Sequence, residues 1–208
     1  MENGYANFAE LYQNEQVNTD YRITAFHRKP EIAIFAIHGG NIEPGTSEVA
    51  TSLGEKLDAS TYLFEGLKRR DNSKLHITST AFDEPTALLM SNMANTILSI
   101  HGYSAVHEEL IYIGGRNQLL KKYIQLALQD AGFQTAEAPI HLLGMNESNI
   151  TNRCKSGAGV QLELSKKLRN RFFLNDDTTS NNRHNHTETL NQFVRAIEKA
   201  TIEYEKQF

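Results

Sequence analysis

The chain has 208 residues, of which 39% are hydrophobic and 22% are charged, and its formal net charge is −4 at pH 7. These values are typical of a soluble globular protein, so we expect residues 1–208 to form a single domain. The weak negative charge excludes a general nucleic-acid binder and a chain that adheres broadly to anionic membranes. We therefore expect no nucleic-acid partner, no membrane partner, and a monomer.

Short β-like runs alternate with helical patterns, and several of the runs are continuously apolar, as in strands covered on both faces. In chain order, we predict strands at 21–26 and 32–37, a helix at 47–57, strands at 61–64 and 75–78, a helix at 84–93, strands at 96–100 and 110–113, a helix at 117–131, a strand at 160–164 and a helix at 188–205. Gly132 is expected to end the third helix, and the polar residues 175–186 to form a surface loop. The alternation predicts an α/β fold with three αβα layers and a mixed, largely parallel central sheet.

The N-terminal residues and the cysteine content indicate the cellular compartment in which the protein is expected. Cys154 is the single cysteine, so no intramolecular disulfide can form, which suits a reducing compartment. The first residues lack the basic and apolar regions of a signal peptide. The longest uninterrupted apolar run, at 32–37, is far shorter than the ~20 residues of a membrane-spanning helix. We expect a soluble, cytoplasmic protein.

Histidines stand at the ends of two predicted strands, where ligands gather in sheets of this kind. His38 ends one apolar run and precedes two glycines, and His101 ends another and precedes one. The two glycines let the chain turn sharply, so that Glu43 can return beside His38. Two histidines and one carboxylate can bind a catalytic zinc ion and leave its fourth position to water. The sequence therefore predicts a Zn²⁺ site at His38, Glu43 and His101.

Two other residues are alternative ligands. His76 lies within a predicted strand and could replace one of the two histidines. Glu48 could replace Glu43, although it suits the first turn of a helix, where negative charge is favoured. Cys154 has no evident base partner, so we interpret it as a small buried residue.

A zinc hydrolase also needs a carboxylate that does not bind the metal, to take a proton from water. Glu163 lies in the apolar run Val-Gln-Leu-Glu-Leu, where an unpaired carboxylate is costly to bury. Arg116 and Arg153 follow or adjoin strands. Their planar guanidinium groups are suited to a substrate carboxylate or a developing oxyanion. We predict Glu163, Arg153 and Arg116 as the catalytic residues.

Several motifs resemble those of the phage-type poly-γ-glutamate hydrolases and their Bacillus relatives over nearly the whole chain. They are residues 38–48 (HGGNIEPGTSE), 75–85 (LHITSTAFDEP), 99–103 (SIHGY), 152–154 (NRC) and 159–165 (GVQLELS). The resemblance implies a zinc-carboxypeptidase-like fold and hydrolysis of the γ-linked amide bonds of poly-γ-glutamate. It implies zinc ligands at His38, Glu43 and His101 and a general base at Glu163, the residues already selected.

The partner implied is an anionic glutamate polymer, which the basic residues Lys68-Arg69-Arg70 and Lys121-Lys122 are expected to attract. The phage relatives suggest that the protein meets an extracellular polymer after cell lysis. Two alternatives stay open. One is a deacylase of small N-acyl-glutamate or N-acyl-aspartate substrates on the same fold. The other is a non-catalytic metal-binding phage or prophage protein. The acidic balance disfavours an aminoacyl-tRNA deacylase.

Overall fold

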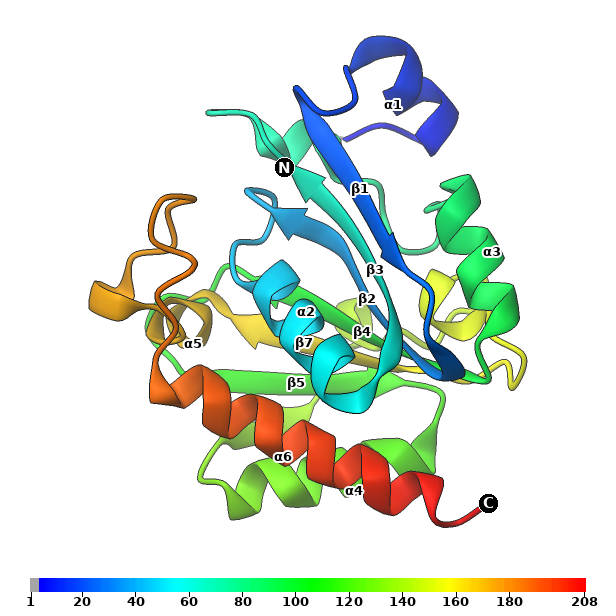
Figure 1. The fold of residues 1–208 in the computed structure, drawn as a ribbon, viewed down its shortest axis with the longest axis vertical. Helices are drawn as coiled ribbons and strands as arrows, with labels where there is room; N and C mark the ends of the chain where they lie inside the picture. Colours follow the sequence, from blue (N-terminus) through cyan, green and yellow to red (C-terminus); the bar gives the residue numbers. More distant parts are fainter. Residues whose placement is uncertain (1–3) are drawn as a thin grey trace.

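A mixed seven-stranded sheet forms the middle of the molecule, as seen in a computed structural model that describes residues 4–208 (Figure 1). The strands are β1 (Tyr21–Phe26), β2 (Lys29–Gly40), β3 (Ala59–Gly66), β4 (Thr96–Tyr103), β5 (Leu110–Gly115), β6 (Gln134–Glu137) and β7 (Val160–Ser165). Their order across the sheet is β1-β3-β2-β4-β7-β5-β6. β1 is antiparallel to β3 and β5 to β7, whereas the other neighbours run parallel. The predicted mixed, largely parallel sheet is confirmed.

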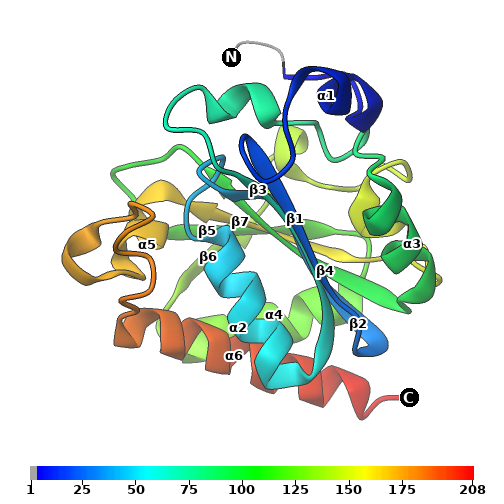
Figure 2. The same cartoon turned by 45° about the horizontal axis from the view of Figure 1, so that its top comes forward.

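Helices cover both faces of this sheet. α2 (Thr46–Leu57), α4 (Gln118–Asp130) and α6 (Glu188–Glu205) lie on one face, and α1 (Phe8–Asn14) and α3 (Pro85–Met93) lie on the other (Figure 2). The short α5 (Lys166–Arg171) follows β7 directly. The three-layer αβα arrangement is thus confirmed. Within residues 4–208, none of the helices has both the length and the apolar character needed to cross a bilayer.

The apolar residues at the centre of β2 belong to two separate hydrophobic clusters, one on each face of the sheet. Ile34 and Ala36 pack with α2, α4 and α6, whereas Phe35 and Ile37 pack with α1 and α3. Successive residues of a strand point to opposite faces, so a strand buried on both sides is apolar throughout. Each fully buried isoleucine or phenylalanine contributes about 1.5–3 kcal/mol to stability. This packing fixes β2 rigidly, and with it the residues at its carboxyl end.

The strand predicted at 75–78 is wrong. These residues leave the 3-10 helix η1 (Asn72–Leu75) and continue as an irregular segment. Leu75 and Ile77 are both fully buried, so their alternation imitates a strand, but no described strand pairs with them. The loop at 175–186 also differs from expectation, because Arg183 within it is buried. α4 does end before Gly132, whose φ of +87° favours glycine, as predicted.

Strand direction decides which residues meet. β2, β4 and β7 run parallel, so their carboxyl ends share one edge of the sheet. β5 runs in the opposite direction: its Tyr112 faces Glu163 near the end of β7, and its Gly115 faces Val160 at the start of β7. The carboxyl end of β5 therefore lies at the opposite edge.

Candidate active site

A tight loop at the end of β2 returns Glu43 to His38. The Glu43 amide donates to the His38 carbonyl at 2.9 Å, and the Thr46 hydroxyl donates to the Glu43 carbonyl at 2.9 Å. Ser47 Oγ accepts from the Gly40 amide at 3.0 Å. These bonds join the loop to the first turn of α2, so the Glu43 carboxylate is held beside the His38 ring.

Three of the predicted residues converge at this point. His38 Nδ1 lies 3.3 Å from Glu43 Oε1 and 3.1 Å from His101 Nδ1. His101 Nδ1 lies 3.9 Å from Glu43 Oε2. Both histidines are buried. The strand ends thus bring two ring nitrogens and one carboxylate into contact, as expected from the sequence.

Neighbouring groups orient these side chains. His38 Nε2 donates to the Ile77 carbonyl at 2.7 Å, because a carbonyl can only accept. With the proton on Nε2, the Nδ1 atom has a lone pair that can bind a metal ion. This arrangement is common among metal-binding histidines. The Gly102 amide donates to Glu43 Oε2 at 2.7 Å. The irregular segment that replaced the predicted strand therefore has a function, since its Ile77 carbonyl orients His38.

His76 stands next to the same group. Its ring stacks on that of His38 with centroids 3.8 Å apart, and its Nε2 lies 3.9 Å from Glu43 Oε1. His38, Glu43 and His76 each offer a ligand atom within 4.8 Å of the others, so this cluster could hold a metal ion. His101 and His76 are consequently two candidates for the third ligand.

The donor distances suit a tetrahedral ion. Two ligand atoms that each lie about 2.0–2.1 Å from a tetrahedral zinc ion are roughly 3.3 Å apart. The distances among His38, Glu43 and His101 run from 3.1 to 3.9 Å. Nitrogen and carboxylate oxygen are also the donors that catalytic zinc takes. The residues present therefore fit the ion that the sequence predicted.

The charges of the cluster favour binding of a cation. Burial opposes ionisation of Glu43, but His38, and then His101 and His76, hold its pKa below the ordinary value. Burial, and then His38, lower the pKa of His101 to about 3. His38, and then burial, lower the pKa of His76 to about 4. At neutral pH the rings of His101 and His76 are therefore uncharged and the Glu43 carboxylate is ionised, which suits metal binding.

Glu163 lies on the strand beside His101. The two residues are paired in the register of β4 and β7, so their side chains leave the same face of the sheet. Glu163 is only 5% exposed. Its Oε1 accepts from Gln161 Nε2 at 2.9 Å, and Gln161 Oε1 accepts from Asn149 Nδ2 at 2.9 Å. Burial, and then the charge of Glu43, raise the pKa of Glu163. A carboxyl pKa that is shifted toward neutral pH suits a group that takes up and releases protons.

Comparison with known proteins identifies the family. Residues 5–196 match the sequence profile of the family described as poly-gamma-glutamate hydrolase. The chain belongs to this family. Membership identifies the protein as a hydrolase and confirms the resemblance seen in its motifs.

Individual relatives agree with this assignment. YndL of Bacillus subtilis (strain 168) is 41% identical over 179 residues, which cover 83% of this chain and 68% of YndL. A structure of a bacteriophage poly-gamma-glutamate hydrolase superposes with a TM-score of 0.96 at 37% identity, covering 98% of this chain and 99% of the other. A structure of YndL described as zinc-free gives a TM-score of 0.88 at 36% identity, covering 97% and 96%.

The structure does not bring Arg116 to the cluster. Its prediction as a catalytic residue rests on its place directly after a strand, but that strand, β5, is antiparallel to β7, so Arg116 lies at the opposite edge. There it pairs with Glu147 at 3.1 Å. The lysines at 121 and 122 lie in the first turns of α4, which also begins at that edge.

Arg153 is placed differently. Its Nε donates to the Ser148 carbonyl at 3.0 Å, and its two other nitrogens donate to the carbonyls of Phe82 and Thr80. It therefore ties its own loop to the segment that follows His76, and its side chain is partly exposed. In the predicted basic turn, Lys68 pairs with Glu15 at 2.6 Å, whereas Arg69 and Arg70 are exposed.

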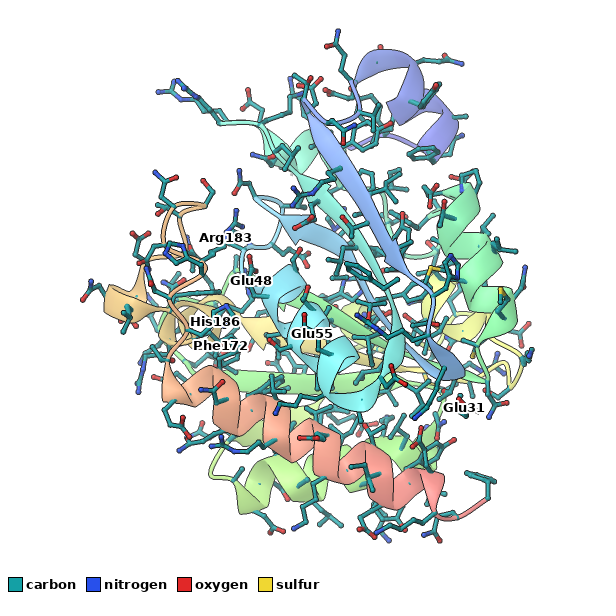
Figure 3. All side chains as sticks on the ribbon, viewed as in Figure 1. Glu31, Glu48, Glu55, Phe172, Arg183 and His186 are labelled. Carbon is teal, nitrogen blue, oxygen red and sulfur yellow. The ribbon has the colours of Figure 1, made fainter. Side chains whose placement is uncertain are left out.

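Two buried arginines near the site were not selected from the sequence. Arg183 donates to the Gly40 carbonyl and to Asn41 Oδ1, and its Nε lies 3.5 Å from Glu48 Oε1 (Figure 3). Glu48 is thus engaged by an arginine, and of the two carboxylates it is Glu43 that lies in the cluster that could hold a metal ion. The second arginine is Arg169 of α5. Both lie in polar, charged stretches of sequence that predict solvent exposure, so their burial could not be predicted from the sequence.

Proposed function

We propose that this protein is a zinc-dependent hydrolase that uses water to cut the γ-glutamyl amide bonds of poly-γ-glutamate. The observation that carries the proposal is the convergence of His38, Glu43 and His101 at one sheet edge, with the buried Glu163 on the adjoining strand. Membership of the poly-γ-glutamate hydrolase family supports the choice of substrate.

His38, Glu43 and His101 would hold the ion. We prefer His101 to His76 as the third ligand for two reasons. The Nδ1 atom of His101 lies 3.1 Å from His38 Nδ1, and His101 is buried whereas His76 is partly exposed. When bound, zinc lowers the pKa of its water to about 7 and polarises the scissile carbonyl. The zinc-free form described for YndL supports zinc as the ion to test.

Glu163 would act as the general base and then as the general acid. It would take a proton from the attacking water at its carboxylate and pass this proton to the leaving amine. Gln161 holds one oxygen of Glu163, which limits rotation of the carboxylate. Arg153 is proposed to bind a substrate carboxylate, because it is partly exposed beside the segment that follows His76. Arg69 and Arg70 would attract the anionic polymer from outside.

Incubation of poly-γ-glutamate with the purified protein tests this proposal, with polymer length followed by size-exclusion chromatography. Zinc-loaded protein is expected to shorten the polymer, and a chelator to stop it. Glu163→Gln should keep zinc and lose at least about 100-fold in turnover, since general acid–base catalysis is worth 10²–10⁴-fold. Near-normal turnover by this variant would rule out Glu163 as the base. Cutting of small N-acyl-glutamates but not of polymer would replace the proposed substrate.

A further inference from the structure

Arg169 is a buried cation without a carboxylate partner. It lies in α5, directly after β7, and is 4% exposed. Among residues 4–208, no carboxylate oxygen lies within ion-pairing distance of its guanidinium. A buried guanidinium is costly unless its N–H groups are hydrogen-bonded. The groups that it contacts therefore account for its position.

Its guanidinium donates to three carbonyls from three distant parts of the chain. Nη1 donates to Pro44 at 2.6 Å, Nη2 to Tyr103 at 3.2 Å and Nε to Leu164 at 3.2 Å. Pro44 follows Glu43, and Leu164 follows Glu163. Tyr103 is two residues after His101. One rigid planar group thus contacts each of the three segments that carry the site.

The adjoining glycines leave room for this group. A Cβ atom added to Gly102 would lie 2.5 Å from Arg169 Nε and 2.6 Å from its Cζ. Gly45 has a φ of +103°, and an added Cβ there would lie 3.3 Å from Arg169 Cβ. The Gly102 amide also donates to Glu43 Oε2. The glycine between His101 and Tyr103 therefore lets the guanidinium reach the backbone beside the ligand cluster.

We propose that Arg169 is a positioning residue, which sets the spacing of Glu43, His101 and Glu163 without touching the substrate. The proposal rests on the proposed function, because it takes these three residues as the working site. Lysine cannot replace this arginine, since a single ammonium group lacks the fork that spans three carbonyls. From beyond ion-pairing distance, the negative charges of Glu43 and Glu163 both favour the positively charged guanidinium.

Zinc affinity, measured by competition with a chromophoric chelator, tests the proposal without any substrate. We expect Arg169→Lys to weaken zinc binding about 10–100-fold, as is usual when a group that orients metal ligands is lost. Gly102→Ala should give a similar loss with the arginine retained, because the new methyl group displaces the guanidinium. Arg171→Lys is the matched control. Arg171 lies on the same helix, is exposed and pairs with Glu109 at 3.0 Å. The Arg171→Lys protein should therefore bind zinc as tightly as wild type.

Two further readouts separate positioning from a general loss of structure. The chelated Arg169→Lys and Gly102→Ala proteins should melt within a few degrees of chelated wild type. On poly-γ-glutamate, kcat should fall about 10–100-fold while KM changes less than about threefold. Zinc affinity within twofold of wild type in both folded variants would overturn the proposal, even if wild type cuts the polymer. A wild-type protein that binds zinc but leaves the polymer intact would overturn the proposed substrate instead, and the zinc affinities would still decide the role of Arg169.

Discussion

Gln161→Leu removes the hydrogen-bonded link that holds Glu163. The Gln161 amide is buried and joins two groups, since its nitrogen donates to Glu163 Oε1 and its oxygen accepts from Asn149 Nδ2, both at 2.9 Å. Leucine has a similar volume, so little of the effect should come from a cavity. The substitution leaves a buried amide donor and a buried carboxylate oxygen without these partners.

The cost follows from the two lost bonds. An unpaired buried donor costs about 1–3 kcal/mol, and loss of a bond to a charged group costs about 1.5–3 kcal/mol. Protonation of Glu163 reduces the second cost, because burial already raises its pKa. We expect a net loss of about 2–4 kcal/mol in the free energy of unfolding, and at least a tenfold lower kcat because the base is no longer oriented.

Urea unfolding of the metal-free protein measures the first quantity. Gln134→Leu is the control, since this glutamine is exposed at the start of the edge strand β6, and its substitution should change stability by less than about 0.5 kcal/mol. If Gln161→Leu is as stable as this control, the link from Asn149 to Glu163 does not stabilise the site, and the reasoning fails.

Three further perturbations test the site. Zinc at 100 times its Kd should stabilise the protein by about 2.7 kcal/mol and raise Tm by about 5–10 °C. An unchanged Tm in calorimetry would contradict a zinc site in the folded protein. His101→Ala should weaken zinc binding more than about 100-fold and His76→Ala about tenfold or less, measured by chelator competition; the reverse order would make His76 the third ligand. Arg183→Met should cost about 2–3 kcal/mol in urea unfolding, because Glu48 loses its cationic partner, and an unchanged midpoint would contradict this.

The convergence of His38, Glu43 and His101 at one sheet edge was predictable from strand ends, because it depends on local sequence pattern alone. His38, His101 and Glu163 each lie at or near the end of a buried apolar run, and the three strands are parallel neighbours. The same logic misplaced Arg116, since the apolar run of β5 reads identically in either direction. The antiparallel pairing of β5 with β7 is set by tertiary packing, which the run itself does not encode.

The arginines show where sequence patterns carry no information. Arg169 lies in Lys-Lys-Leu-Arg-Asn-Arg, a pattern typical of a solvated helix. Its burial depends on the carbonyls of Pro44 and Tyr103, which are 125 and 66 residues away in the chain. The sequence offers His76 as an alternative ligand, but only the fold shows that it stacks on His38.

Anomalous diffraction at the zinc edge, measured on crystals of zinc-loaded protein that shortens poly-γ-glutamate, locates the ion and identifies its ligands. We predict one peak about 2.0–2.2 Å from His38 Nδ1, the Glu43 carboxylate and His101 Nδ1, with Glu163 nearby but not bound to the ion. A peak ligated by Glu163, or no peak at this cluster in active protein, would contradict the proposed zinc site.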